Sequence, residues 1–150
     1  MVKIVSGNLL DATEDLICHQ VNCQGVMASG VAKAIRDKWP NVYTEYLDHC
    51  DSHGTMSLLG TVQYVPLSRY KAVVNMFSQA NYGYDGNRYT SYDAFYKCLE
   101  AISNDTPSTM SVAFPYKIGS DRGGASWDVI HAMICDVLGD RDVIIYRLEE

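Results

Sequence analysis

No stretch of this 150-residue sequence approaches the run of about 20 apolar residues that a membrane-spanning helix requires. The N-terminus also lacks the basic start and long apolar segment of a signal peptide. Basic residues are outnumbered: the formal net charge is −6 at pH 7, whereas a nucleic-acid-binding surface is usually basic. From these absences we expect a protein that neither enters a membrane nor binds nucleic acid.

Cysteine patterns that hold disulfides or metal ions are also missing. The five cysteines are odd in number and scattered, which fits a reducing cytoplasm better than a disulfide framework. No Cys-x-x-Cys pair occurs, and Cys18, His19 and Cys23 straddle a predicted strand. Neither the G-x-x-x-x-G-K-[ST] loop nor the G-x-G-x-x-G fingerprint is present. The sequence thus predicts a cytoplasmic protein with no metal site and no organic cofactor.

Strand-like and helix-like segments alternate along the chain. Short apolar segments predict strands at 3–6, 16–21, 61–67, 71–77, 111–118 and 143–148. Apolar residues at helical spacing predict helices around 31–39, 42–47, 92–102 and 127–138, and Pro40 either ends a helix or begins one. Thr90 with Asp93 resembles a helix-starting box, and Ser126 is a suitable N-cap. This alternation, without repeat or linker, predicts one α/β domain over residues 1–150 with a largely parallel sheet.

Two glycine-containing segments connect predicted strands to predicted helices. The first runs from His19 to Ala32 and the second from Ile118 to Gly124. Glycine lets the backbone approach a ligand closely, and a helix N-terminus presents free N–H groups to an anion. Either segment alone is typical of ordinary turn chemistry. Because ligands bind beyond the carboxyl ends of parallel strands, two such loops at one sheet edge could grip a diphosphate from both sides.

Together with the N-terminal segment, these loops resemble the macro domain family along most of the chain. The matching segments are Gly7-Asn8-Leu9-Leu10, His19-Gln20-Val21-Asn22 followed by Gly30-Val31-Ala32, and Pro115 to Trp127. They resemble the family's G-[DN]-[IL]-x, N-x-x-N … G-G-[VI]-A and P-x-[IL]-G-x-G … G-[LI]-x-W patterns. The sequence is most similar to the branch that contains ADP-ribose-1″-phosphate phosphatases and ADP-ribosyl-glutamate hydrolases. This resemblance implies a three-layer α/β/α fold with a mixed, largely parallel sheet of about six strands.

The resemblance also implies a ligand, ADP-ribose or a derivative of it, and the residues that bind it. Asn8 would accept a hydrogen bond from the adenine amino group, and Leu9 would shape the adenine pocket. Asn22 would orient the distal ribose. Further ligand contacts are expected from the two loops, at Gln20, Ser29, Gly30, Val31, Ile118, Gly119, Ser120, Asp121, Arg122 and Gly123. ADP-ribosylated protein is a further partner that the family likeness suggests.

Three residues are candidate catalytic groups for hydrolysis at the C1″ end of ADP-ribose. His19 could transfer a proton, Asp121 could activate water, and Asn22 would hold the ribose. Each also has a structural interpretation: a core histidine, a solvated loop carboxylate and a turn-forming asparagine. Gly123 stands where the glutamate hydrolases carry an aspartate, which favours a phosphatase or an ester hydrolase. The alternative is a reader module that binds ADP-ribose without hydrolysing it.

The polar segment between Gln79 and Tyr89 carries several aromatic residues. Tyr82, Tyr84 and Tyr89 make it a candidate lid over adenine or ribose. An aromatic surface loop with no ligand is the alternative interpretation. Trp127, by contrast, lies on a regular apolar helical face and is expected in the core.

Overall fold

The structure, a computed structural model, describes residues 1–149, and these contain one mixed sheet. Its strands are β1 (Val2–Ser6), β2 (Leu16–Asn22), β3 (Val62–Ser68), β4 (Lys71–Gln79), β5 (Val112–Pro115) and β6 (Val143–Arg147). They lie in the order β1-β6-β5-β2-β4-β3. Only β3 runs antiparallel to its neighbour within this described sheet, and the other pairs are parallel. The predicted mixed, largely parallel sheet is confirmed.

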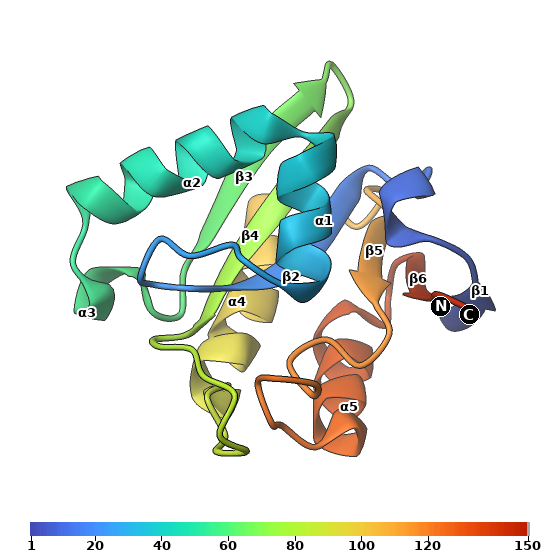
Figure 1. The fold of residues 1–150 in the computed structure, drawn as a ribbon. Helices are drawn as coiled ribbons and strands as arrows, with labels where there is room; N and C mark the ends of the chain where they lie inside the picture. The colour runs from blue at the N-terminus through green and yellow to red at the C-terminus, as the bar shows by residue number, and fades with distance from the viewer. Residues whose placement is uncertain (150) are drawn as a thin grey trace.

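Helices cover both faces of the sheet (Figure 1). They are η1 (Leu9–Asp11), α1 (Gly30–Lys38), α2 (Pro40–Ser52), α3 (Thr55–Leu58), α4 (Tyr92–Asp105) and α5 (Trp127–Leu138). Alternate residues of β2 point to opposite faces: Cys18 packs in the cluster with α4 and α5, and Ile17 in the cluster with α1 and α2. This arrangement confirms the three-layer α/β/α fold. Among residues 1–149, no helix combines the length and apolar character needed to cross a bilayer.

Three local predictions differ from the structure. The strand predicted to reach residue 118 ends at Pro115, because Lys117 adopts a left-handed conformation (φ 60°) that turns the chain. Thr90 does not begin α4: the N-cap is Ser91, whose hydroxyl accepts a hydrogen bond from the Ala94 N–H. The sequence pattern predicts no helix at 55–58, where the structure has the short helix α3.

The parallel strands β4, β2 and β5 are neighbours, so the loops that follow them meet at one edge of the sheet (Figure 1). We name these loops by their residues: the first loop (23–29) follows β2, the middle loop (80–91) follows β4, and the second loop (116–126) follows β5. A register shift adjoins this edge, where Val21 pairs with Phe77 but Asn22 pairs with Gln79. Such bulges redirect side chains where strands end.

Candidate functional site

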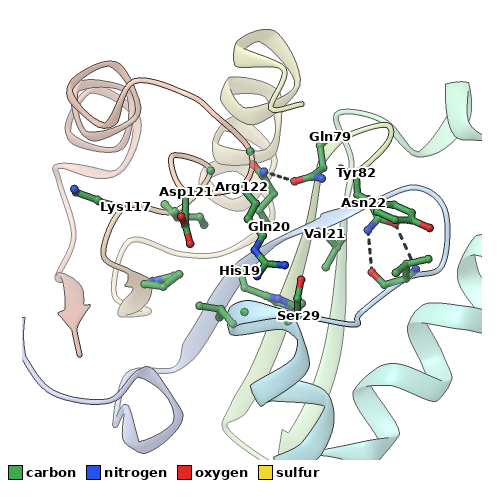
Figure 2. Close-up of a pocket in the computed structure, with 18 of the residues that line it drawn as sticks. His19, Gln20, Val21, Asn22, Ser29, Gln79, Tyr82, Lys117, Asp121 and Arg122 are labelled. Carbon is green, nitrogen blue, oxygen red and sulfur yellow. Dashed lines mark hydrogen bonds between the residues drawn. The ribbon is translucent and has the colours of Figure 1, made fainter. Parts of the chain in front are cut away.

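A cleft of about 210 Å³ lies between the three loops (Figure 2). The predicted site residues that line it are His19, Gln20, Asn22, Ser29, Gly30, Val31, Ile118, Gly119, Asp121, Arg122 and Gly123. Segments nearly 100 residues apart in the sequence therefore form one cavity. Three predicted residues, Asn8, Leu9 and Ser120, are not part of its lining in the described chain.

Asn8 and Leu9 have structural roles where the structure places them. The Asn8 side chain caps η1, since its Oδ1 accepts a hydrogen bond from the Leu10 N–H at 2.9 Å. Leu9 is 6% exposed and packs in the core beneath α1 and α2. Their contact with adenine therefore stays a prediction, and the Asn8 oxygen is already engaged.

Asn22 shapes the first loop. Its Oδ1 accepts hydrogen bonds from the Gln24 N–H and the Tyr46 hydroxyl, both at 2.9 Å. Its Nδ2 donates to the Val26 carbonyl at 2.8 Å (Figure 2). One amide hydrogen thus remains for a ligand, and Asn22 combines the turn-forming role with a place in the cleft wall.

Helix α1 begins at the cleft. Gly30 has φ +61°, a conformation that favours glycine, and Ser29 precedes it as an extended N-cap. The Ser29 hydroxyl lies 3.2 Å from the Tyr84 hydroxyl and makes no capping hydrogen bond to the helix. Because the first-turn N–H groups of a helix lack intrahelical partners, this terminus offers donors to an anion.

The glycines of the second loop are required by close packing. A Cβ on Gly123 would lie 2.2 Å from Thr90 Oγ1 and 2.6 Å from the Gly119 carbonyl. The Thr90 hydroxyl donates to that same carbonyl at 2.8 Å, and the Tyr89 and Thr90 N–H groups donate to the Gly123 carbonyl. These contacts fasten the second loop to the middle loop.

Gln20 ties β2 to β4 and to the middle loop. Its Nε2 donates to Gln79 Oε1 at 2.5 Å and to Thr90 Oγ1 at 2.8 Å. Its Oε1 accepts from the Ser78 hydroxyl at 2.7 Å. Both amide hydrogens are therefore engaged, so that any ligand contact would use the oxygen of Gln20.

Tyr84, an exposed residue of the middle loop that lines the cleft, contacts both other loops. Beyond its contact with Ser29, its ring lies under the Arg122 guanidinium, with 4.3 Å between Cζ and the ring centroid. We call these three residues the latch. Tyr82 also lines the cleft, whereas the Tyr89 hydroxyl bonds the Asp85 carboxylate within the middle loop. The candidate lid is thus built from Tyr82 and Tyr84, and Tyr89 anchors it.

His19 is buried in the cleft wall, at 1% exposure. Its Nε2 lies 2.5 Å from Asn75 Oδ1, and Nδ1 has no hydrogen-bond partner in the described chain. Burial lowers the pKa of His19 to about 4, although the bond to Asn75 opposes that shift. His19 is therefore neutral near pH 7, where its ring can accept a hydrogen bond but gains a proton only with difficulty.

Of the three candidate catalytic residues, Asp121 is the one exposed to solvent. Figure 2 shows its carboxylate turned toward the cleft from the second loop. No group of three His, Cys, Asp or Glu side chains in residues 1–149 is arranged to hold a metal ion. Asp121 is the one acidic residue among those that line the cleft in the described chain, and a carboxylate is suited to proton transfer.

The sequence interpretation missed several lining residues at the ends of strands. Gln79 ends β4, while Pro115, Tyr116 and Lys117 mark the end of β5 and the turn after it. Their positions directly before the predicted loops were a usable signal. Figure 2 shows the Lys117 side chain pointing away from the cleft centre, so its backbone contributes to the wall.

Comparison with known proteins gives a family and several relatives. The Macro domain family matches residues 18–134. The ADP-ribose 1″-phosphate phosphatase of Scheffersomyces stipitis is 35% identical over 74 residues, which is 44% of this chain and 43% of that protein. The DNA ADP-ribosyl glycohydrolase of Mycobacterium tuberculosis is 28% identical over 153 residues, which is 97% of this chain and 42% of that protein.

A solved structure shares the fold as well. Thermosipho africanus DarTG in complex with ADP-ribose superposes with a TM-score of 0.80 at 18% identity, covering 97% of this chain and 41% of that one. The alignments with the two curated relatives span less than half of either relative's length. The activities named for those larger proteins therefore do not follow for this chain from the shared fold.

Proposed function

The chain belongs to the macro domain family, and we propose that it binds ADP-ribose in the cleft and hydrolyses ADP-ribose derivatives at C1″. The observation that carries this proposal is the meeting of two glycine loops and a helix N-terminus around one cavity. These features supply backbone N–H donors, which suit a diphosphate. They are needed because the chain as a whole carries a charge of −6.

In the proposed complex, the diphosphate lies between the two loops. The N–H groups of Gly30 and Val31 at the start of α1 face one phosphate, and the Gly119–Gly123 segment closes over the other. The remaining amide hydrogen of Asn22 contacts the distal ribose. Arg122 is suited to a phosphate contact once it leaves Tyr84.

In the proposed reaction, water attacks the phosphorus of a 1″-phosphate, the carbonyl carbon of a 1″-ester, or C1″ itself where a base is attached. The bond to the leaving oxygen or nitrogen breaks, and that atom takes up the proton that the water loses. Asp121 accepts a proton from that water, since its carboxylate is exposed in the cleft. The loop N–H groups stabilise the negative charge that develops. This mechanism draws only on side chains, backbone and water.

Two substrate classes fit the proposed reaction: ADP-ribose 1″-phosphate, and ADP-ribose joined through C1″ to an ester or a DNA base. The names of the two curated relatives support both, one as a phosphatase and one as a DNA ADP-ribosyl glycohydrolase. ADP-ribosylated protein is the further partner that we propose. The acidic charge of the chain favours the small phosphate ester over a DNA-linked substrate.

The test has a binding arm and a turnover arm. Calorimetry should show binding of ADP-ribose in preference to AMP and NAD, and its absence would remove the whole proposal. Phosphate release from ADP-ribose 1″-phosphate should fall at least about tenfold in Asp121→Asn, a loss of about 1.4 kcal/mol in transition-state stabilisation. Asp128→Asn, at the exposed start of α5, is the matched control and should keep full activity. Binding without turnover of any C1″-linked substrate would establish the reader module instead.

A further inference from the structure

A row of three side chains leads from the surface of α2 to the wall of the cleft. The Gln63 amide donates through Nε2 to the Glu45 main-chain carbonyl at 3.1 Å. Asn75 Nδ2 donates to Gln63 Oε1 at 3.0 Å, and His19 Nε2 lies 2.5 Å from Asn75 Oδ1. We call Gln63, Asn75 and His19 the relay.

The direction of every hydrogen bond in the relay follows from its outer end. A main-chain carbonyl can only accept, so Gln63 must turn Nε2 to Glu45 and Oε1 to Asn75. Asn75 must then turn Oδ1 to His19. An amide oxygen also only accepts, so His19 must carry its proton on Nε2. The other ring nitrogen, Nδ1, is left as a bare acceptor.

That bare acceptor belongs to one of the residues that line the cleft. Nδ1 is buried and has no hydrogen-bond partner in residues 1–149, so a small movement of the wall would bring it into contact with a ligand. A buried polar atom without a partner is unfavourable, and a ligand that supplies a donor removes that penalty. The low pKa of His19 keeps the ring neutral, so Nδ1 retains its lone pair near pH 7.

We propose that Gln63 and Asn75 are positioning residues that fix His19 in its Nε2-protonated form, so that Nδ1 accepts a hydrogen bond from an O–H group in the cleft. The O–H group belongs either to the terminal ribose or to the attacking water. This inference rests on the proposed function, because it assigns a role to one wall of the same ligand cleft.

A pair of substitutions at Gln63 separates this role from simple packing. Gln63 is half-buried and shares a shallow groove with Glu45 and Asp48, so a charged side chain can reach solvent there. Gln63→Lys provides only donors, which turns Asn75 Oδ1 outward and Nδ2 toward His19. His19 Nε2 must then accept, and the proton moves to Nδ1. Gln63→Glu provides only acceptors and keeps the native direction, so it is the matched control.

The tautomer is measured directly by ¹⁵N NMR of the imidazole ring. We expect Nδ1 to be unprotonated in the native protein and in Gln63→Glu, and protonated in Gln63→Lys, with similar thermal unfolding for all three. Addition of ADP-ribose or ADP-ribose 1″-phosphate should shift the native Nδ1 resonance. A native protein with its proton on Nδ1, or an unchanged tautomer in Gln63→Lys, would overturn the relay.

Function is measured on the same three proteins. Gln63→Lys should lose about tenfold in affinity for ADP-ribose if the ribose is the donor. It should lose about tenfold in kcat for ADP-ribose 1″-phosphate, with affinity kept, if water is the donor. An inverted tautomer with unchanged affinity and kcat would disprove the contact at Nδ1. Absence of ADP-ribose binding by the native protein would instead refute the proposed function. The tautomer measurement would still test the relay, because it needs no ligand.

Discussion

The Arg122 guanidinium lies over the ring of Tyr84, 4.3 Å from its centroid, and thereby connects the second loop to the middle loop. The Tyr84 hydroxyl extends this connection to Ser29 at the start of α1. The cleft behind the latch measures about 210 Å³, below the range of about 300–1,000 Å³ that is usual for small-molecule sites. We therefore expect the latch to open when a ligand as large as ADP-ribose enters.

Tyr84→Ala should accelerate ligand association. An exposed cation–π contact contributes about 0.5–1 kcal/mol, so its loss should raise the open fraction and the association rate about two- to fivefold. Stopped-flow mixing with a fluorescent ADP-ribose analogue measures this rate. Tyr70→Ala is the matched control, since Arg69 lies over the Tyr70 ring in the β3–β4 turn, away from the cleft lining. Equal rates in both variants would argue against the latch.

Ser29→Asp should weaken ligand binding without lowering the thermal stability of the protein. Aspartate is a favourable N-cap, so thermal stability should stay the same or rise slightly. Its carboxylate would compete for the N–H groups proposed to hold the diphosphate and would repel it, weakening ADP-ribose binding at least about tenfold. Ser126→Asp makes the same change at the N-cap of α5 and should leave calorimetric affinity unaltered. Retained affinity in Ser29→Asp would place the diphosphate elsewhere.

His19 should make the protein less stable as pH falls from about 6.5 toward 4. The buried ring stays neutral with a pKa of about 4, whereas the unfolded chain takes up a proton near the ordinary value of 6.5. The unfolded state therefore binds more protons in this window, which costs on the order of 3 kcal/mol by its lower end. Urea unfolding of the native protein and His19→Gln across this range measures the effect. Parallel stability curves would show that His19 does not contribute.

Gly123→Ala should damage both the second loop and ligand binding. The new Cβ would overlap Thr90 Oγ1 and the Gly119 carbonyl, and such overpacking typically costs about 1–3 kcal/mol. We expect a lower unfolding midpoint and loss of ADP-ribose binding. Gly54→Ala is the control, because its Cβ would meet only Ser57 Oγ at 3.9 Å. A stable, fully binding Gly123→Ala protein would contradict the role assigned to this packing.

Much of the site could be anticipated because its chemistry is local. The strand ends and glycines around Asn22, Gly30 and Gly119 are visible in the sequence, and parallel strands place such loops at one edge. The hydrogen-bond partners of the side chains in the site could not be anticipated in the same way. Whether Gln20 faces a ligand or braces the middle loop depends on Thr90, which is 70 positions away.

The sequence by itself determined the layered α/β architecture and the places where a ligand cleft had to be sought. Hydrophobic periodicity decides which face of each element is buried, and glycine decides where the backbone can turn toward a ligand. Only the tertiary structure decided which polar atoms in that cleft remain free. Hydrogen bonds to Tyr46 occupy Asn22, and burial beside Asn75 keeps His19 neutral. Such pairings join distant parts of the chain, so they exist only once the strands and helices have packed.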